Sequence, residues 1–152
     1  MLMACSNSQT RSEFDYSRLI LLDSENLCES GIENAYEDVK PVLSKITTPK
    51  EVTRIKSEND DYIIKFNGQN FPVYIFETDD SVERCWQNAK NIFFHIVNEQ
   101  LKTSDKKFYA FYGGNDLFGG FLTNSEVNLI KAENPGSEYE WPYLPSYTET
   151  TQ

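Results

Sequence analysis

The sequence has very few residues of the kinds that usually carry metal or acid–base chemistry: it holds a single histidine, His95, in 152 residues. A helical pattern over residues 80–102 places His95 on the polar side with Asn88 and Asn91. We expect a solvated histidine there, because a lone histidine among amides has no catalytic partner. Cys85 lies about ten residues earlier in the same helix, roughly 15 Å along its axis, which excludes a Cys–His pair. The sequence therefore predicts no catalytic residue.

Cysteine is also scarce. Cys5, Cys28 and Cys85 are far apart, form no CxxC pair and are odd in number. This spacing argues against both a zinc site and a disulfide scaffold. We therefore expect a reducing compartment, the cytoplasm, with Cys85 packed as a small apolar side chain and with no metal or cofactor.

No apolar run approaches the roughly 20 residues that cross a bilayer. The residues Leu2-Met3-Ala4-Cys5 resemble the end of a bacterial lipoprotein signal, but the basic and long apolar regions of such a signal are missing from the sequence as given. If the start has been trimmed, Cys5 is a lipid anchor; otherwise residues 1–13 are a flexible leader. No other membrane contact is expected.

Basic residues are too few to balance the acidic ones. The chain has 14 lysines and arginines against 24 carboxylates, a net charge of −10 and an isoelectric point near 4.5. Such a surface repels nucleic acid and anionic membranes, and it steers basic proteins toward it. Solubility alone would explain the same charge, and both interpretations stay open.

Four of the seven glycines fall at the tip of a predicted hairpin over residues 106–123. We expect this tip to expose Leu117 and Phe118 between glycine pairs that tolerate positive φ. The tip lacks the lysine and hydroxyl of a P-loop and the GxGxxG spacing, and it leads into a strand, so it does not predict phosphate binding. Turn chemistry explains Asn115 and Asp116, because one loop carboxylate falls short of a calcium site.

Hydrophobic periodicity predicts the other elements. They are a buried strand over 16–23, a helix over 32–46 with Ser30 and Glu33 as its capping box, strands over 51–57, 61–66 and 71–77, a long helix over 80–102 capped by Asp80, and a short helix over 125–133 capped by Asn124. Pro41 should kink or restart the first helix. Asn67-Gly68 predicts a hairpin turn, and Pro72 marks its second arm as a strand end or edge.

Together these elements predict one α+β domain over residues 14–152. Its mostly antiparallel sheet consists of the 51–77 meander and the 106–123 hairpin. The long helix packs on that sheet, with shorter helices around it. At 39% hydrophobic and 14% aromatic residues, the chain can bury a single core.

Carboxylates are concentrated near the start of the chain. Between residues 13 and 38 there are eight, with Arg18 as the single basic residue: Glu13, Asp15, Asp23, Glu25, Glu29, Glu33, Glu37 and Asp38. A charge run is usually a solvated face. Because this one surrounds a single helix start, it favours a directional acidic patch.

The tail segment over residues 138–145, EYEWPYLP, interleaves acids with aromatic rings. Rings supply desolvated contact area and carboxylates supply steering, which suits an anchor for a basic partner. The alternative is that Trp141, Tyr143 and Leu144 fold back and cover a sheet edge. The sequence does not choose between these interpretations.

The stretch YGGNDLFGGFLT over 112–123, followed by WPYLP over 141–145, resembles the paired signature of small bacterial immunity proteins found beside polymorphic and contact-dependent growth inhibition toxins. The resemblance implies a non-enzymatic antitoxin that binds the C-terminal domain of its cognate toxin, often a nuclease, in the cytoplasm. It carries over no binding residues, because such interfaces diverge with each toxin. The partner-binding candidates therefore come from the acidic patch, the loop tip and the tail: Glu25, Glu29, Glu33, Glu37, Asn115, Asp116, Phe118, Glu138, Tyr139, Glu140, Trp141 and Tyr143.

Two other functions are compatible with the sequence. One is an acidic adaptor or nucleic-acid mimic that binds a host protein rather than a toxin. The other is a hydrolase that uses a carboxylate pair, either Asp60 with Asp61 or Asp79 with Asp80. Turns and helix caps already explain both pairs, so the inhibitor is the leading hypothesis.

Overall fold

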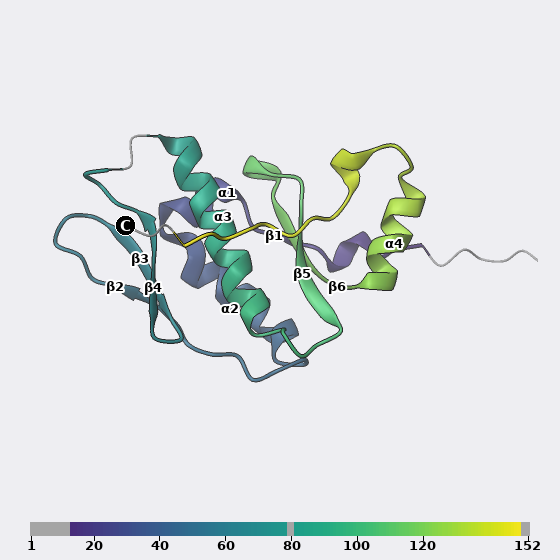
Figure 1. The fold of residues 1–152 in the computed structure, drawn as a ribbon, viewed down its shortest axis with the longest axis horizontal. Helices are drawn as coiled ribbons and strands as arrows, with labels where there is room; N and C mark the ends of the chain where they lie inside the picture. The colour runs from purple at the N-terminus through teal and green to yellow at the C-terminus, as the bar shows by residue number, and fades with distance from the viewer. Residues whose placement is uncertain (1–12, 79–80, 150–152) are drawn as a thin grey trace, which may run out of the picture.

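In the computed structural model, which describes residues 13–78 and 81–149, two small antiparallel sheets lie on opposite sides of a long central helix (Figure 1). That helix is α3, Val82–Glu99. The first sheet has the order β2-β3-β4, with bounds Val52–Ile55, Tyr62–Phe66 and Gln69–Tyr74. The second has the order β1-β6-β5, with bounds Ile20–Leu21, Phe118–Thr123 and Lys106–Phe111. The predicted α+β class is confirmed, but the meander and the hairpin form separate sheets rather than one.

The shorter helices close the outer faces of this arrangement. Figure 1 shows α1 and α2 behind α3, and α4 on the far side of the second sheet. Their bounds are Ser24–Asn26 for α1, Ile32–Leu43 for α2 and Asn124–Glu133 for α4. Single turns of 3-10 helix occupy Tyr16–Arg18 (η1), Gly114–Asp116 (η3) and Glu138–Glu140 (η4), and a π-turn, η2, occupies Leu27–Gly31.

The meander follows its sequence pattern closely. Asn67 and Gly68 take φ values of 51° and 77°, the left-handed pair that a tight hairpin between β3 and β4 requires. Pro72 lies on β4, an edge strand, where its missing N–H does not interrupt the sheet. Both predictions are confirmed.

The long helix buries more than one face. Besides the predicted apolar residues, Phe94 is fully buried, and its ring stacks on Phe108 of β5 with centroids 4.7 Å apart. This follows from the two-sheet arrangement, because α3 contacts β4 on one side and β5 on the other. The helix is capped by Ser81, whose hydroxyl accepts the Arg84 N–H. Asp80, the predicted cap, lies outside the described residues.

The N-terminal third departs most from prediction. The strand expected over 16–23 pairs with β6 only at Ile20 and Leu21, because the preceding residues form the 3-10 turn η1. The predicted capping box at Ser30 is wrong: Ser30 takes φ 73° inside a kinked turn, and its hydroxyl accepts a hydrogen bond from Arg54. Glu33 instead accepts the Tyr62 hydroxyl of β3.

Two helix ends also differ from expectation. Helix α2 runs through Pro41 and ends two residues later at Leu43, so Ile46 lies beyond it and the predicted restart does not occur. Helix α4 is capped by Thr123 rather than Asn124. Thr123 exchanges hydrogen bonds with Glu126 in a full capping box, which satisfies two otherwise free N–H groups.

Cys28 and Cys85 form a disulfide that ties η2 to α3, so the expectation of reduced cysteines is wrong. Cys85 is buried as predicted, but as a bonded partner rather than as a free apolar side chain. No sequence pattern indicates this pair, because 57 positions separate the two residues and only the packing of η2 on α3 brings them together. Cys5 lies outside the described residues.

Removing this disulfide should cost about 2 to 5 kcal/mol of folding stability, because the link restricts the unfolded chain. Urea denaturation of the double variant C28S/C85S should show this loss. Adding dithiothreitol should lower the wild-type midpoint toward that of the variant and leave the variant unchanged. Equal stability of the oxidised wild type and the double variant would contradict the assignment.

The prediction that the hairpin loop exposes Leu117 and Phe118 is wrong for Leu117, which is fully buried, whereas Phe118 is half-buried. The Leu117 carbonyl accepts the N–H groups of Leu22 and Asp23. The following glycines are needed for space rather than for positive φ: a Cβ at Gly119 would lie 2.2 Å from the Phe108 ring, and one at Gly120 would lie 2.7 Å from Leu19. Leu117 and the two glycines after it are therefore part of the core.

Gly119→Ala should destabilise the protein by about 1 to 3 kcal/mol, because the fully buried Phe108 ring cannot move aside. Gly120→Ala is the matched control. Its Cβ meets the end of the Leu19 side chain, which is only half-buried and can rotate away, so the loss should be smaller. Urea denaturation measures both, and equal losses would contradict the role assigned to Phe108.

Candidate functional site

The tail covers the open edge of β5. Ala110 and Tyr143 exchange two backbone hydrogen bonds, of 2.8 and 2.9 Å, and Pro142 is buried. Two residues earlier on β5, the Asn98 side chain of α3 forms hydrogen bonds with both the N–H and the C=O of Phe108. Figure 1 shows the tail continuing across the front of α3 toward the first sheet.

Two of the three tail aromatics predicted as partner anchors are used inside the protein. The Trp141 Nε1–H donates to the Asn134 carbonyl at 2.9 Å, and Lys131 lies over the Trp141 ring, so Trp141 packs at the end of α4. The Tyr143 hydroxyl donates to the Tyr112 carbonyl. Tyr143 therefore supports the interpretation that the tail covers a sheet edge, whereas Leu144 is exposed.

Beside this seam, five apolar and aromatic side chains gather at the surface. We call them the tyrosine patch: Tyr16, Leu21, Tyr112, Phe118 and Tyr139. The Tyr112 ring lies 5.1 Å from Tyr139 and 6.5 Å from Phe118, and Leu21 is the cross-strand neighbour of Phe118. The Tyr16 hydroxyl is near enough to Tyr112 to contribute to raising the pKa of Tyr112. Tyr139 is 71% exposed, Leu21 58% and Tyr16 43%, although each belongs to an ordered element or turn.

Carboxylates border the tyrosine patch. Glu138 is exposed beside Tyr139, and Glu140 accepts a hydrogen bond from the Tyr112 hydroxyl. This hydrogen bond, together with burial, raises the pKa of Tyr112 to about 12, because ionisation would place two negative oxygens against each other. The hydrogen bond holds the Tyr112 ring in a fixed orientation.

The other predicted residues lie in two places, one formed by η3 and α1 and the other by η2 and α2. Asn115 and Asp116 are exposed in η3, which packs against α1 and so lies near Glu25. Glu29 is exposed on η2, whereas Glu33 is held by Tyr62 and Glu37 pairs with Lys40 on α2. The early acids therefore do not form one patch with the tail. Of the candidates, Phe118, Glu138, Tyr139 and Glu140 are brought together.

Three patch members were not predicted: Tyr16, Leu21 and Tyr112. Each stood in a run of β-formers and looked like strand material. Tyr112 takes φ 57°, a left-handed turn that leaves the strand before the glycines. Such a value in a tyrosine has no sequence signature.

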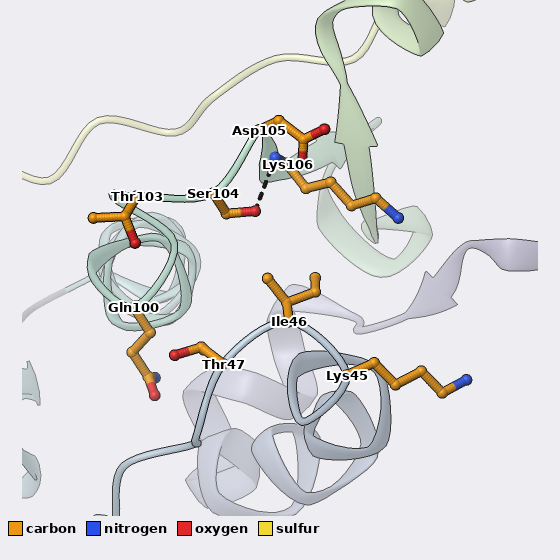
Figure 2. A pocket seen from close by; sticks show the side chains of 8 residues that line it. All are labelled: Lys45, Ile46, Thr47, Gln100, Thr103, Ser104, Asp105 and Lys106. Atoms are coloured by element: carbon orange, nitrogen blue, oxygen red, sulfur yellow. Dashed lines mark hydrogen bonds between the residues drawn. The ribbon is translucent and has the colours of Figure 1, made fainter.

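Figure 2 shows a hollow lined by the residues that follow α2 and α3 and by the first residue of β5. Its volume is about 400 Å³. Lys45 and Lys106 extend along one side of it, and the Lys106 N–H donates to the Ser104 hydroxyl at 3.0 Å. The side chains that line it include one carboxylate, Asp105, and no histidine or cysteine. They offer no base and nucleophile pair for catalysis.

The residues proposed for hydrolysis are used locally. Asp60 takes φ 59° in a turn, and the Asp61 carboxylate accepts hydrogen bonds from Ser57 and from the Phe76 N–H. Asp79 lies outside the described residues, as does Asp80. His95 is half-buried rather than fully solvated as predicted, because its ring packs against those of Phe71 and Tyr147.

Tyr112 should remain protonated at pH 11, where an ordinary tyrosine, with a pKa near 10, is largely ionised. Its folded pKa is raised, so its contribution to stability is present below about pH 10 and is lost as the pH rises toward 12. Ultraviolet titration of the wild type minus Tyr112→Phe isolates this phenol. Glu140→Gln should return its pKa toward 10, and an unchanged midpoint would contradict the assignment.

No helix in the described part of the chain is long and apolar enough to cross a bilayer. Within the same residues, no three histidine, cysteine, aspartate or glutamate side chains are grouped as a metal site requires. No protein-family model, curated protein or solved structure matches the chain.

Proposed function

We propose that this protein is a stoichiometric inhibitor that binds a basic partner protein, as bacterial immunity proteins bind their toxins. The observation that carries the proposal is the tyrosine patch bordered by Glu138 and Glu140. Exposed aromatic rings held in fixed positions supply contact area at low entropic cost, which is typical of binding surfaces. The packing of the sheets does not explain why the Tyr139 ring is exposed.

The overall charge supports a basic partner. A net charge of −10 accelerates the approach of a cationic protein and slows that of nucleic acid or an anionic membrane. Among the described residues, neither Glu138 nor Glu140 forms an ion pair, and two cations of neighbouring segments are already used: Arg18 pairs with Glu126, and Lys131 lies over Trp141. The carboxylates at the patch therefore face the partner uncompensated.

The mechanism proposed is occlusion rather than catalysis. A surface that presents carboxylates around aromatic rings can cover a cationic cleft and take the place of its anionic substrate. If the partner is a nuclease toxin, the carboxylates would compete with phosphates for the same lysines and arginines.

The family resemblance and the disulfide favour different compartments for this protein. The resemblance to immunity proteins of nuclease toxins implies the cytoplasm, where nucleic acid lies. The Cys28–Cys85 disulfide favours an oxidising compartment, because cytosolic thiols are kept reduced. Cell fractionation with thiol trapping decides between the two compartments.

Two substitutions in and beside the tyrosine patch should act differently on a candidate partner, such as the product of the neighbouring gene. Tyr139→Ala should speed dissociation by about 30-fold, equivalent to about 2 kcal/mol for a lost aromatic anchor. Glu138→Lys should slow association and weaken its dependence on salt, because exposed border charges act on encounter. Surface plasmon resonance at two salt concentrations measures both.

Glu37→Lys is the control, because it makes the same charge change on α2, away from the patch. It should leave dissociation unchanged and slow association less. If Glu37→Lys has the larger effect and Tyr139→Ala has none, the partner binds the helix α2 surface instead.

A further inference from the structure

A groove of about 860 Å³ runs between the N-terminal segment and the C-terminal half of α4. Its apolar surface comes from Phe14, Leu129 and Pro135, and two carboxylates, Glu13 and Glu133, stand on it. Tyr16 belongs both to this groove and to the tyrosine patch, so the two surfaces are continuous. The proposed function does not use the groove.

Its polar groups are held in place. The Phe14 N–H donates to Glu133 Oε1 at 3.2 Å, which fixes the carboxylate at the end of α4. Asn134 Nδ2 lies 3.3 Å from the Tyr16 hydroxyl and 2.9 Å from the Ile130 carbonyl. Neither Glu13 nor Glu133 forms an ion pair with any cation of the described chain. An apolar groove with uncompensated, oriented negative charge suits a long cationic side chain with an apolar stem.

The protein holds one of its own guanidinium groups in this way, next to the groove. The Arg18 guanidinium lies 5.1 Å from the centre of the Phe14 ring and pairs with Glu126. An aromatic face beside a carboxylate favours arginine over lysine, because the planar guanidinium can stack on the ring and donate two parallel hydrogen bonds to the carboxylate. On the groove side, the exposed Tyr16 ring and Glu133 offer the same combination, while the buried Phe14 ring packs beneath Tyr16.

We propose that this groove binds an arginine side chain presented by the basic partner. The inference rests on the proposed function for the identity of the partner, but the chemistry of the groove can be tested alone. The guanidinium would meet Glu133 and Glu13, and the methylene stem would lie along Leu129 and Pro135.

The probe is the blocked peptide Ac-Ala-Arg-Ala-NH₂, with its citrulline analogue as the neutral control of the same shape. In ¹⁵N NMR spectra of the full chain, the arginine peptide should shift the amides of Phe14, Tyr16 and Leu129 and saturate at millimolar concentration. Glu133→Gln keeps the hydrogen-bond acceptor and removes the charge, and it should weaken binding at least fivefold. Glu58→Gln, in the exposed turn between β2 and β3, removes the same charge outside the groove and should change binding less than twofold.

Equal shifts from the arginine and citrulline peptides, or no shift at all, would overturn the inference. Shifts at the groove that depend on protein concentration without peptide would also overturn it, because they would mean that a second copy of the chain occupies the groove. If the peptide fails while the partner still binds through Tyr139, only the groove is rejected. If the peptide binds and no basic protein does, the groove stands and the proposed function is rejected.

Discussion

The packing of the Phe108 ring is the interaction on which the rest of the structure depends. Phe108 points from β5 into the space between the second sheet and α3, where it stacks on Phe94 and contacts Phe121. Gly119, the cross-strand neighbour of Ala110 on β6, gives the ring room because it has no Cβ. Because this ring locks the sheet onto the helix, it also fixes the β5 edge, the loop that follows β5 and the tail that pairs with that edge.

The tyrosine patch is a consequence of how that edge is closed. Backbone groups of an unpaired edge strand need hydrogen-bond partners. Here the Asn98 side chain bonds the backbone of Phe108, and the tail bonds the backbone of Ala110. Once the tail is anchored at Tyr143, the preceding turn η4 can only lie beside the hairpin loop, which brings Tyr139 against Tyr112. The pairing of the tail with the β5 edge therefore brings together the surface that we propose as the binding site.

The acidic residues illustrate how little a charge count says about a site. Asp15 and Asp23 cap short helical turns, Glu33 binds a tyrosine hydroxyl, and Glu37 pairs with Lys40. These carboxylates are largely committed to local structure, whereas within the described residues the Glu13 and Glu138 side chains form no hydrogen bond or ion pair, and Glu133 accepts only the Phe14 N–H. The useful distinction is between acids with internal partners and acids without them, and it requires the packed structure.

The sequence by itself determined the features that depend on neighbouring residues. The Asn67-Gly68 turn, the edge proline, the three meander strands and the long apolar helix all follow from local periodicity and turn chemistry, and so does the α+β class. Within the site, the tail acids and Tyr139 were visible as an aromatic and acidic motif. Only the tertiary structure decided the division into two sheets, the Cys28–Cys85 disulfide, the burial of Leu117 and the assembly of the patch. Each of these joins segments far apart in the chain, and a one-dimensional pattern holds no information about which distant faces meet.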